Sequence, residues 1–565
     1  MLNSNNYKRE GGFKISKNKF PIQIHRDENG IAYVFAENKE DVIRGQAFVL
    51  AQDRLFQIEF YRAIIKGEAA SLLGSAMLQS DIKMQVLNLK GNAKKSYQYL
   101  DTETKEMLRW YFEGFNEYLN VGKDEFPVEL GLLGIEPKPL TTVEVVSIKH
   151  FIGLFHSQNL DDEILSLNLA ARTDKASELL PLSINLDRTK KMEFTVDSIS
   201  AGSLNANDNH FRPFTTPMLP YPKLGSNNWA ISGKKSKSGK KSKSGKPILS
   251  NDPHVDARML PGTFYPIGLF CPEFKAVGIA TSNIPGILAG RNEFVSYGIT
   301  NAYGDSQDVF IEEIDGDFYI HKGEKVAFEK RKITISVKDS TNVELEIRST
   351  KKGPIISDFP VFNILTNDVV SLRLSLAETK SNSIGFDRLL ETKNVSEFRD
   401  ALKGMDNMFF NYAIADVEGN IAHQSTGLVP IRANHGGELP TYGNQEDTWL
   451  GFIPKEELPH MVNPERGWIG TANNDTRPDE YPYYYSNHFS PYYRYQRITE
   501  VLSENKKISS EDLWDMILDV KNMQAELFTP LFVSALAKNE ETNDIAAVLK
   551  AWNYQEDINS VGASI

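Results

Sequence analysis

The chain has 565 residues, of which 63 are basic and 75 acidic, giving a formal net charge of −12. Its length exceeds what one hydrophobic core usually organises, and its acidic balance argues against nucleic acid as a partner, because phosphate binding needs a basic surface. The single cysteine, Cys271, excludes an internal disulfide and metal sites built on several thiolates, and no apolar run approaches the roughly 18 to 20 residues that span a membrane.

Residues 1–10 lack the apolar stretch of a secretory signal, so we expect either a cytoplasmic protein or a sequence that begins after a removed leader. Residues 20–36 predict two short strands around an Asp-Glu-Asn-Gly turn. Asn38 has the residue type of a helix N-cap, and the apolar spacing from residue 42 to residue 50 predicts a helix with a buried face. Residues 140–170 predict a second helical region.

Residues 188–225 contain many serines, asparagines and prolines and therefore predict a loop or linker. From Ser226 to about residue 350 the pattern changes to short strands and turns, and helices are expected again near 396–402 and 510–520. A tandem repeat of Lys-Lys-Ser-Lys-Ser-Gly occupies 234–245. We interpret it as a solvated hairpin tip, with a basic patch for an anionic partner as the alternative.

Ser226 follows a glycine and precedes a short apolar, strand-like run. Gly-Ser alone is a common turn dipeptide. The next apolar run ends on Asn-Asp-Pro-His at 251–254, and because adjacent antiparallel strands bring their ends together, we expect His254 to lie beside Ser226. A solvated turn residue is the alternative for His254, and a turn is also the usual interpretation of the Asn-Asn-Asp cluster at 473–475.

Taken together, these motifs resemble those of the penicillin acylase family of N-terminal-nucleophile hydrolases. The matching segments follow the family's order from about Ile24 to Arg497: Ala-Gln-Asp-Arg-Leu-Phe-Gln at 51–57, Leu-Gly-Ser-Asn-Asn-Trp at 224–229, Asn-Asp-Pro-His at 251–254 and Gly-Thr-Ala-Asn-Asn-Asp at 470–475. The resemblance implies that the precursor cuts itself between Gly225 and Ser226. It also implies an α+β fold, the four-layer αββα sandwich of this hydrolase type, with an additional helical light-chain region.

The resemblance further implies a division of the chain into three parts. Residues 1–190 correspond to a largely helical light chain, residues 191–225 to a spacer, and residues 226–565 to a heavy chain that stays associated with the light chain after cleavage. Heavy chains of the family are longer, so we expect this sequence to be incomplete at its C-terminal end.

By the same resemblance, Ser226 is the nucleophile, and the backbone N–H of Asn301 and the side-chain amide of Asn473 stabilise the oxyanion. Asn474 is the register-shifted alternative to Asn473.

Two further residues are assigned around the nucleophile. Arg497 corresponds to the family's active-site arginine, with Arg494 expected to be structural. His254 stands where penicillin G enzymes carry a glutamine and resembles the homoserine-lactone and cephalosporin acylases.

The expected substrate-binding residues are Ala289 and Val255. Ala289 stands where penicillin G acylase has a pocket phenylalanine, which implies a wider or differently lined acyl pocket. No organic cofactor is expected.

A structural calcium site is implied by four residues that match the ligands of that enzyme: Glu163, Asp305, Asp308 and the carbonyl of Gln307. Hard carboxylate oxygens suit Ca²⁺. A further aspartate of the site has no counterpart at 485–487, and Asp305 and Asp308 have a second interpretation as polar turn residues.

These assignments predict a self-processing amidohydrolase that cleaves small N-acyl compounds, of penicillin, cephalosporin or N-acyl-homoserine lactone type, through an acyl-enzyme on Ser226. The free α-amine of Ser226 would be the base, since its ordinary pKa of about 7.7 to 8 leaves it partly neutral. One alternative is a non-catalytic family member that never matures and serves as a binding protein. A conventional serine hydrolase is disfavoured because no Gly-x-Ser-x-Gly elbow surrounds Ser226.

Overall fold

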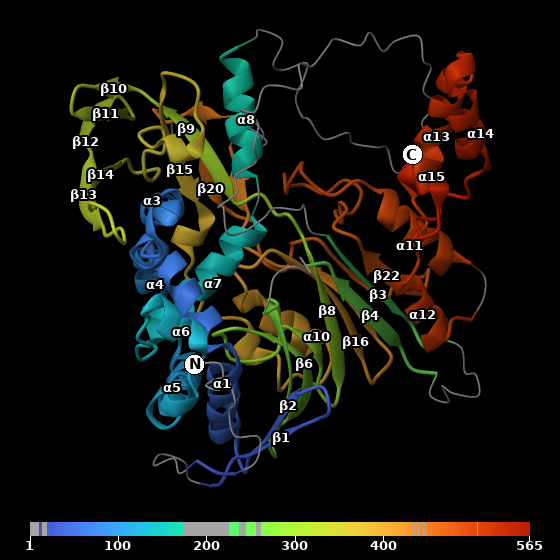
Figure 1. Cartoon of the computed structure of the whole chain (residues 1–565), viewed down its shortest axis with the longest axis horizontal. Helices are drawn as coiled ribbons and strands as arrows, with labels where there is room; N and C mark the ends of the chain where they lie inside the picture. Colours follow the sequence, from blue (N-terminus) through green and yellow to red (C-terminus); the bar gives the residue numbers. More distant parts are fainter. Residues whose placement is uncertain are drawn as a thin grey trace.

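The fold contains two β-sheets that pack face to face, and helices lie on the outer side of each (Figure 1). The computed structural model describes residues 11–13, 20–157, 159–172, 225–236, 245–255, 261–433, 437, 440–444, 448–504 and 507–565. The predicted spacer, apart from Gly225, and most of the Lys-Ser-Gly repeat lie outside these residues. The mixture of helices and sheets confirms the predicted α+β class.

The larger sheet has nine strands in the order β1-β2-β5-β6-β7-β8-β16-β17-β21. Their bounds are β1 Gln23–Arg26, β2 Ala32–Phe35, β5 Phe264–Phe270, β6 Lys275–Thr281, β7 Ala289–Arg291, β8 Val295–Asn301, β16 Phe410–Asp416, β17 Ile421–Ser425 and β21 His460–Val462. Neighbouring strands are antiparallel except β2 and β5, which run parallel in the register Ala32 to Ile267. This parallel pair joins a segment that precedes Ser226 to one that follows it.

The smaller sheet has the order β22-β3-β4, with β3 (Ser226–Ile231) between β4 (Ile248–Pro253) and β22 (Trp468–Thr471). Both pairs are antiparallel, and Ser226 stands opposite Pro253. Ser226 is therefore the first residue of a central strand.

Side chains of β3 alternate between two environments, as the period of two in a strand requires. Ala230 packs between the two sheets with small and aliphatic residues of the larger sheet, and Trp229 and Ile231 pack on the other side beneath α11 (Tyr493–Ser503) and α12 (Ser510–Ile517). By the same alternation, Ser226 lies on the side that faces the larger sheet.

The outer side of the larger sheet is covered by a helical layer led by α1 (Lys39–Lys66). Asn38 caps α1 by accepting the Asp41 N–H, which confirms the predicted cap. α5 (Thr102–Val121) crosses α1 so closely that a Cβ on Gly114 would lie 2.1 Å from the Arg44 carbonyl oxygen, and only glycine fits there.

The predicted helical region 140–170 consists of two helices, α7 (Thr142–His156) and α8 (Leu160–Ala170). The helices of the same N-terminal part are α2 Ala70–Leu73, α3 Leu78–Leu87, α4 Leu89–Tyr97 and α6 Val128–Leu133. Later helices are α10 Val395–Ala401, α13 Met523–Leu536, α14 Asn543–Ala551 and α15 Val561–Ser564. α10 and α12 confirm the helices expected near 396–402 and 510–520. No helix in the described ranges combines the length and apolar character needed to cross a bilayer.

Smaller sheets complete the described structure. Their strands are β9 Gln307–Glu312, β10 Ile314–Asp315, β11 Phe318–His321, β12 Glu324–Ala327, β13 Glu329–Ile335, β14 Val343–Ser349, β15 Val369–Leu374, β18 Pro430–Arg432, β19 Thr441–Tyr442 and β20 Trp449–Phe452. They confirm the predicted run of short strands after Ser226.

Candidate active site

The hydroxyl of Ser226 lies against the peptide bond that precedes it. Its Oγ donates to the carbonyl oxygen of Gly225 at 2.7 Å, and that same oxygen accepts the backbone N–H of His254 at 3.0 Å. The second contact follows from the register of β3 and β4, and it confirms that His254 lies beside Ser226. A nucleophile and a backbone donor thus converge on one carbonyl group.

Asn473 holds the backbone of Ser226 from the other side. Its Oδ1 accepts the Ser226 N–H at 2.7 Å, and its Nδ2 donates to the Asn301 carbonyl at 2.9 Å. The residue is fully buried with a φ of 62°, a left-handed conformation that asparagine tolerates better than most side chains. Asn474 instead makes local contacts, accepting the Ala472 N–H and donating to the Asp475 carbonyl. The structure therefore brings Asn473, and not Asn474, to Ser226.

Arg494 completes this group from α11. Its Nη1 donates at 2.8 Å both to the Ser226 carbonyl and to Asn227 Oδ1, and its Nη2 donates at 2.8 Å to Asn473 Oδ1. Burial lowers the pKa of Arg494 below its usual value, while the nearby Tyr303 and Asp252 oppose the shift. The guanidinium fork fixes the positions of Ser226 and Asn473 relative to each other.

The structure does not bring Arg497, the arginine assigned to the active site, to Ser226. Arg497 pairs with Asp519 at 2.7 Å and with Glu500 at 3.3 Å, whereas Arg494, expected to be structural, is the arginine that contacts Ser226. The two arginines stand three residues apart on one helix, where side chains share a face. Spacing along the sequence therefore does not decide which of the two arginines contacts Ser226.

The side chain of His254 belongs to a polar group beside the nucleophile. Its Nε2 lies 2.8 Å from Asp252 Oδ2, and the Asn227 amide donates to Asp252 at 3.2 Å. Burial alone would raise the pKa of Asp252, but the hydrogen bond and charge of His254 outweigh it and lower the pKa below its usual value. Sequence reasoning missed Asp252 and Asn227, although both lie within two residues of assigned positions.

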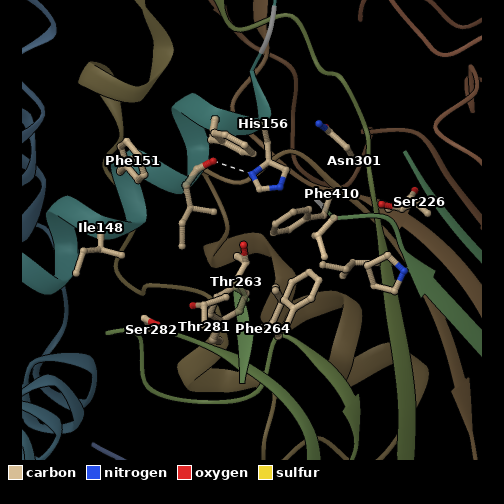
Figure 2. A pocket seen from close by; sticks show the side chains of 18 of the residues that line it. Ile148, Phe151, His156, Ser226, Thr263, Phe264, Thr281, Ser282, Asn301 and Phe410 are labelled. Atoms are coloured by element: carbon tan, nitrogen blue, oxygen red, sulfur yellow. Dashed lines mark hydrogen bonds between the residues drawn. The ribbon is translucent and has the colours of Figure 1, made fainter. Parts of the chain in front are cut away.

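A cavity of about 160 Å³ opens beside Ser226 (Figure 2). Val255 and Asn301 line it, as expected, but the lining takes Leu288 in place of its neighbour Ala289. The remaining apolar and aromatic lining residues include Tyr61, Ile65, Ile148, Phe151, Ile152, Phe155, Phe264, Ile299, Phe386 and Phe410. Such a lining suits an apolar acyl group.

His156 is a polar residue inside this apolar wall. Its Nδ1 lies 2.7 Å from the Ile152 carbonyl, and its ring meets Phe410 edge-on with centroids 4.8 Å apart (Figure 2). Because a carbonyl only accepts, we assign the proton to Nδ1. Burial lowers the pKa of His156, so the ring is neutral near neutral pH and its Nε2 is a hydrogen-bond acceptor.

The residues assigned to calcium do come together. Carboxylate oxygens of Glu163, Asp305 and Asp308 lie within 4.8 Å of one another, and all three residues are buried. Burial raises the pKa of Glu163 well above its usual value, and the charges of Asp308 and Asp305 add to the shift.

Two residues that sequence reasoning missed lie inside this acidic cluster. Arg432 donates from Nη2 to Asp305 Oδ1 at 2.7 Å and from Nε to Asp308 Oδ1 at 2.9 Å. Asn159 Nδ2 faces Glu163, Asp305 and the Gln307 carbonyl at 2.7 to 3.0 Å.

Residues 21–565 match the family model described as penicillin amidase. The chain belongs to the penicillin amidase family. Among its relatives in this family, the penicillin acylase 2 proenzyme of Pseudomonas sp. (strain SE83) is 29% identical over 570 residues, which cover 98% of this chain and 71% of that protein. The acyl-homoserine lactone acylase QuiP of Pseudomonas aeruginosa is 28% identical, with coverage of 91% and 61%.

Penicillin G acylase of Escherichia coli is 23% identical over 96% of this chain and 70% of its own length. The chain thus spans 61% to 71% of the length of these three penicillin amidase relatives. A solved structure, the thermostable penicillin G acylase from Alcaligenes faecalis in its orthorhombic form, superposes with a TM-score of 0.47 at 22% identity, covering 59% of this chain and 60% of that one.

Proposed function

We propose that this penicillin amidase family member is a self-processing amidohydrolase that cleaves N-acyl amides through an acyl-enzyme on Ser226. The observation that carries the proposal is the position of the Ser226 hydroxyl, 2.7 Å from the Gly225 carbonyl oxygen and next to an apolar cavity. The names of the relatives, penicillin acylase and acyl-homoserine lactone acylase, support the same bond type, an amide that joins an acyl group to an amine.

Processing would begin with attack of Ser226 Oγ on the carbonyl carbon of Gly225. The new C–O bond forms, the C–N bond breaks, and the hydroxyl proton passes to the released α-amine. The His254 N–H, 3.0 Å from the Gly225 oxygen, is placed to stabilise the negative charge that develops there. Water then hydrolyses the ester, leaving Ser226 with a free amine and a free hydroxyl.

In turnover, the α-amine of Ser226 would take the hydroxyl proton as Oγ attacks the substrate carbonyl. Asn473 Oδ1 already accepts the Ser226 N–H, so it orients the amine, and the adjacent Arg494 cation favours the neutral, basic form of that amine. The Asn473 amide has two hydrogens, one of which is directed to the Asn301 carbonyl. The other is free to join the Asn301 N–H as the oxyanion donors.

The same proposal includes the predicted four-layer sandwich and the continued association of the two chains after cleavage. Helices over the nine-stranded sheet, the two facing sheets and the layer of α11 and α12 support the four-layer αββα sandwich. The parallel pair of β2 and β5 supports continued association of light and heavy chains after cleavage, because its hydrogen bonds join residues on both sides of the cut.

The deciding experiment is the intact mass of the denatured wild-type protein and of Ser226→Ala, followed by hydrolysis assays with N-acyl amides. We expect a heavy fragment that starts at Ser226 in the wild type alone, with amide hydrolysis in the same sample. An uncut wild-type chain without hydrolysis would favour the alternative of a binding protein that never matures.

A further inference from the structure

The layer between the two sheets becomes polar toward Ser226. Away from that end it is made of small and aliphatic residues such as Ala230 and Leu249. Next to Ser226 the same face carries two asparagines, Asn228 of β3 and Asn251 of β4, which stand directly opposite each other. Burying a polar side chain between sheets costs free energy unless it is hydrogen-bonded. The hydrogen bonds of these asparagines therefore account for their place in the layer.

One edge of β8 is open near its end at Asn301. The pairing of β7, a strand of three residues, with β8 ends at Tyr297. On the opposite edge, β16 pairs with β8 up to Asn301 itself. In an antiparallel ladder, successive residues direct their N–H groups to opposite edges. Since the Ala302 N–H donates to the Phe409 carbonyl, directly before β16, the N–H groups of Ile299 and Asn301 point to the open edge.

The amide of Asn251 occupies this open edge. Its Oδ1 accepts the Ile299 N–H at 3.0 Å, and its Nδ2 donates to the Ile299 carbonyl at 2.8 Å. A neighbouring strand would make the same two bonds, so the side chain of Asn251 serves as a short substitute for one. Nδ2 also donates to the Asn227 carbonyl at 3.0 Å, which uses its second hydrogen. One side chain thus ties β3, the strand of the nucleophile, to β8.

The contact is close and lies near the proposed oxyanion donor. A Cβ on Gly298 would lie only 2.6 Å from the Cβ of Asn251, so glycine at 298 allows the strands to approach. Asn301 follows Ile299 by two residues, and its carbonyl accepts from Asn473 at 2.9 Å. The bonds of Asn251 therefore fix the end of β8 relative to the first residues of β3.

We propose that Asn251 is a positioning residue that sets the place of the Asn301 N–H relative to Ser226. The inference rests on the proposed function, in which that N–H stabilises the oxyanion. Asn251 is not among the described residues that line the cavity, and it acts through Ile299. A displacement of about 1 Å at a reacting centre lowers a rate by up to about 100-fold, so a tie of this kind affects catalysis without touching the substrate.

The test measures processing and the hydrolysis of octanoyl 4-nitroanilide in the wild type and in Asn251→Ala. The variant should still release the heavy fragment, since the donor proposed for self-cleavage is the His254 N–H. Its kcat should fall by about 10- to 100-fold with KM nearly unchanged, because the cavity is intact and only the oxyanion loses a well-placed donor. Inhibition by octylboronic acid, which forms an anionic tetrahedral adduct with serine, should weaken by a similar factor.

Asn292→Ala is the matched control at the other end of β8. The Asn292 amide donates to the Leu390 and Thr392 carbonyls and accepts the Phe294 and Val295 N–H groups, so its removal breaks a comparable set of hydrogen bonds. This variant should have a lower Tm and an unchanged kcat.

The inference is wrong if processed Asn251→Ala keeps the wild-type kcat, or if kcat falls equally in Asn292→Ala. Asn251→Ser, which is closer in size and cannot make all three hydrogen bonds, replaces the alanine variant if that one does not fold. Failure of the proposed function appears separately, as a wild-type chain that is uncut or does not hydrolyse N-acyl amides.

Hydrogen–deuterium exchange decides the inference even in that case. The peptide 296–302 should exchange about tenfold faster in Asn251→Ala than in the wild type, because the Ile299 N–H loses its acceptor. Asn292→Ala should instead affect the peptide that contains residues 293–295. Equal exchange of the peptide 296–302 in the wild type and in Asn251→Ala would overturn the inference.

A second, independent inference concerns the acidic cluster. We infer that Arg432 takes the place of the metal ion that the family resemblance implies. Its side chain is 1% exposed, and the carboxylates of Asp305 and Asp308 that it contacts are 0% and 3% exposed. A guanidinium bonded at 2.7 and 2.9 Å supplies the positive charge that these carboxylates need.

The remaining oxygens of the predicted calcium set are also occupied by protein donors. Glu163 Oε2 accepts the Val309 N–H at 2.8 Å, while Glu163 Oε1 and the Gln307 carbonyl accept from Asn159. Calcium requires six to eight oxygen ligands converging at about 2.3 to 2.6 Å. An arrangement in which these oxygens already face N–H groups does not fit that ion.

The experiment is metal analysis of the purified wild-type protein, together with thermal unfolding with and without a chelator. We expect no stoichiometric calcium and an unchanged Tm. Arg432→Met should lower the Tm by several degrees, because it leaves buried carboxylates without a cation. Millimolar Ca²⁺ should restore part of that loss, whereas Arg109→Met, which removes an exposed ion pair, should change little.

One calcium ion per wild-type chain, or a Tm that falls with the chelator, would overturn this inference. Rotation of the Asn159 amide would then account for the ion, since its Oδ1 has no partner within the described residues and would turn toward the cluster. Both wild-type measurements decide the question even if Arg432→Met does not fold.

Discussion

The backbone N–H of His254 and the hydroxyl of Ser226 donate to one and the same acceptor, the carbonyl oxygen of Gly225. The relationship arises from strand register, since Ser226 and Pro253 stand opposite each other in β3 and β4. A hairpin therefore places a nucleophile and an oxyanion donor at the bond whose cleavage we propose. The proposed self-processing would depend on backbone geometry more than on a histidine side chain.

Gly225 should be needed for its small size. A Cβ at this position would lie 3.0 to 3.1 Å from the guanidinium atoms of Arg494, closer than ordinary contacts. We expect Gly225→Ala to slow self-cleavage by about tenfold, since it displaces the arginine that holds Ser226. The rate is followed as the appearance of the heavy fragment by intact mass. Gly131→Ala, where a Cβ meets nothing within 4 Å, should process like the wild type.

The two arginines of α11 provide a direct comparison. Arg494→Lys loses the fork that joins Ser226, Asn227 and Asn473, and two charged hydrogen bonds at about 1.5 kcal/mol each correspond to about a 100-fold loss in kcat/KM. Arg497→Lys alters a partly exposed ion pair and should leave hydrolysis near the wild-type level. Equal losses in the two variants would contradict the placement of Arg494.

Asn473→Gly should retain the fold and lose most turnover. Glycine accepts the φ of 62°, so the substitution removes the side-chain amide with little backbone strain. Loss of one oxyanion donor typically lowers kcat by about 100- to 1,000-fold. Asn363→Gly, at another left-handed asparagine with a φ of 53°, measures the effect of the backbone alone. Wild-type kcat in a fully processed Asn473→Gly sample would exclude the role of this amide.

Stability should fall as the solution is acidified. Burial lowers the pKa of His150 and of His423 to about 3, with nearby positive charges adding to the shift. The unfolded chain binds these protons near pH 6.5 and the folded chain only near pH 3, so the free energy of unfolding is highest above pH 6.5 and decreases below it.

Each histidine contributes up to about 1.4 kcal/mol per pH unit within that window. Urea unfolding at pH 7.0 and 5.5 measures the decrease, and His150→Gln should make it smaller. An unchanged difference between the two pH values in His150→Gln would show that this histidine is not the source.

The sequence was sufficient to predict features that depend on local pattern. The cap at Asn38 and the approach of His254 to Ser226 follow from residue types and from strand pairing, and both are present in the structure. The inward-facing residue near 289 could not be predicted in the same way. The cavity lining includes Leu288, which directly precedes β7, and not its neighbour Ala289, and a shift of one position is enough to turn a side chain away from a cavity.

The contacts of Arg432 were beyond prediction from one sequence. Arg432 stands 124 residues after Asp308, and nothing in its local pattern marks it as a partner of buried carboxylates. The family resemblance implied a metal ion beside the acidic residues and gave no information on an arginine among them. Arg494 was missed for a different reason, since Arg497 lies on the same face of α11 and fits the spacing equally well.

The parallel pairing of β2 with β5 has a consequence for reversibility. In the uncut protein, both strands belong to one polypeptide, so unfolding and refolding are unimolecular and independent of protein concentration. After a cut at Ser226 the same ladder would join two polypeptides, and refolding would become second order in concentration. Dilution would then favour separated subunits. After maturation, the fold would persist chiefly because the two polypeptides dissociate slowly.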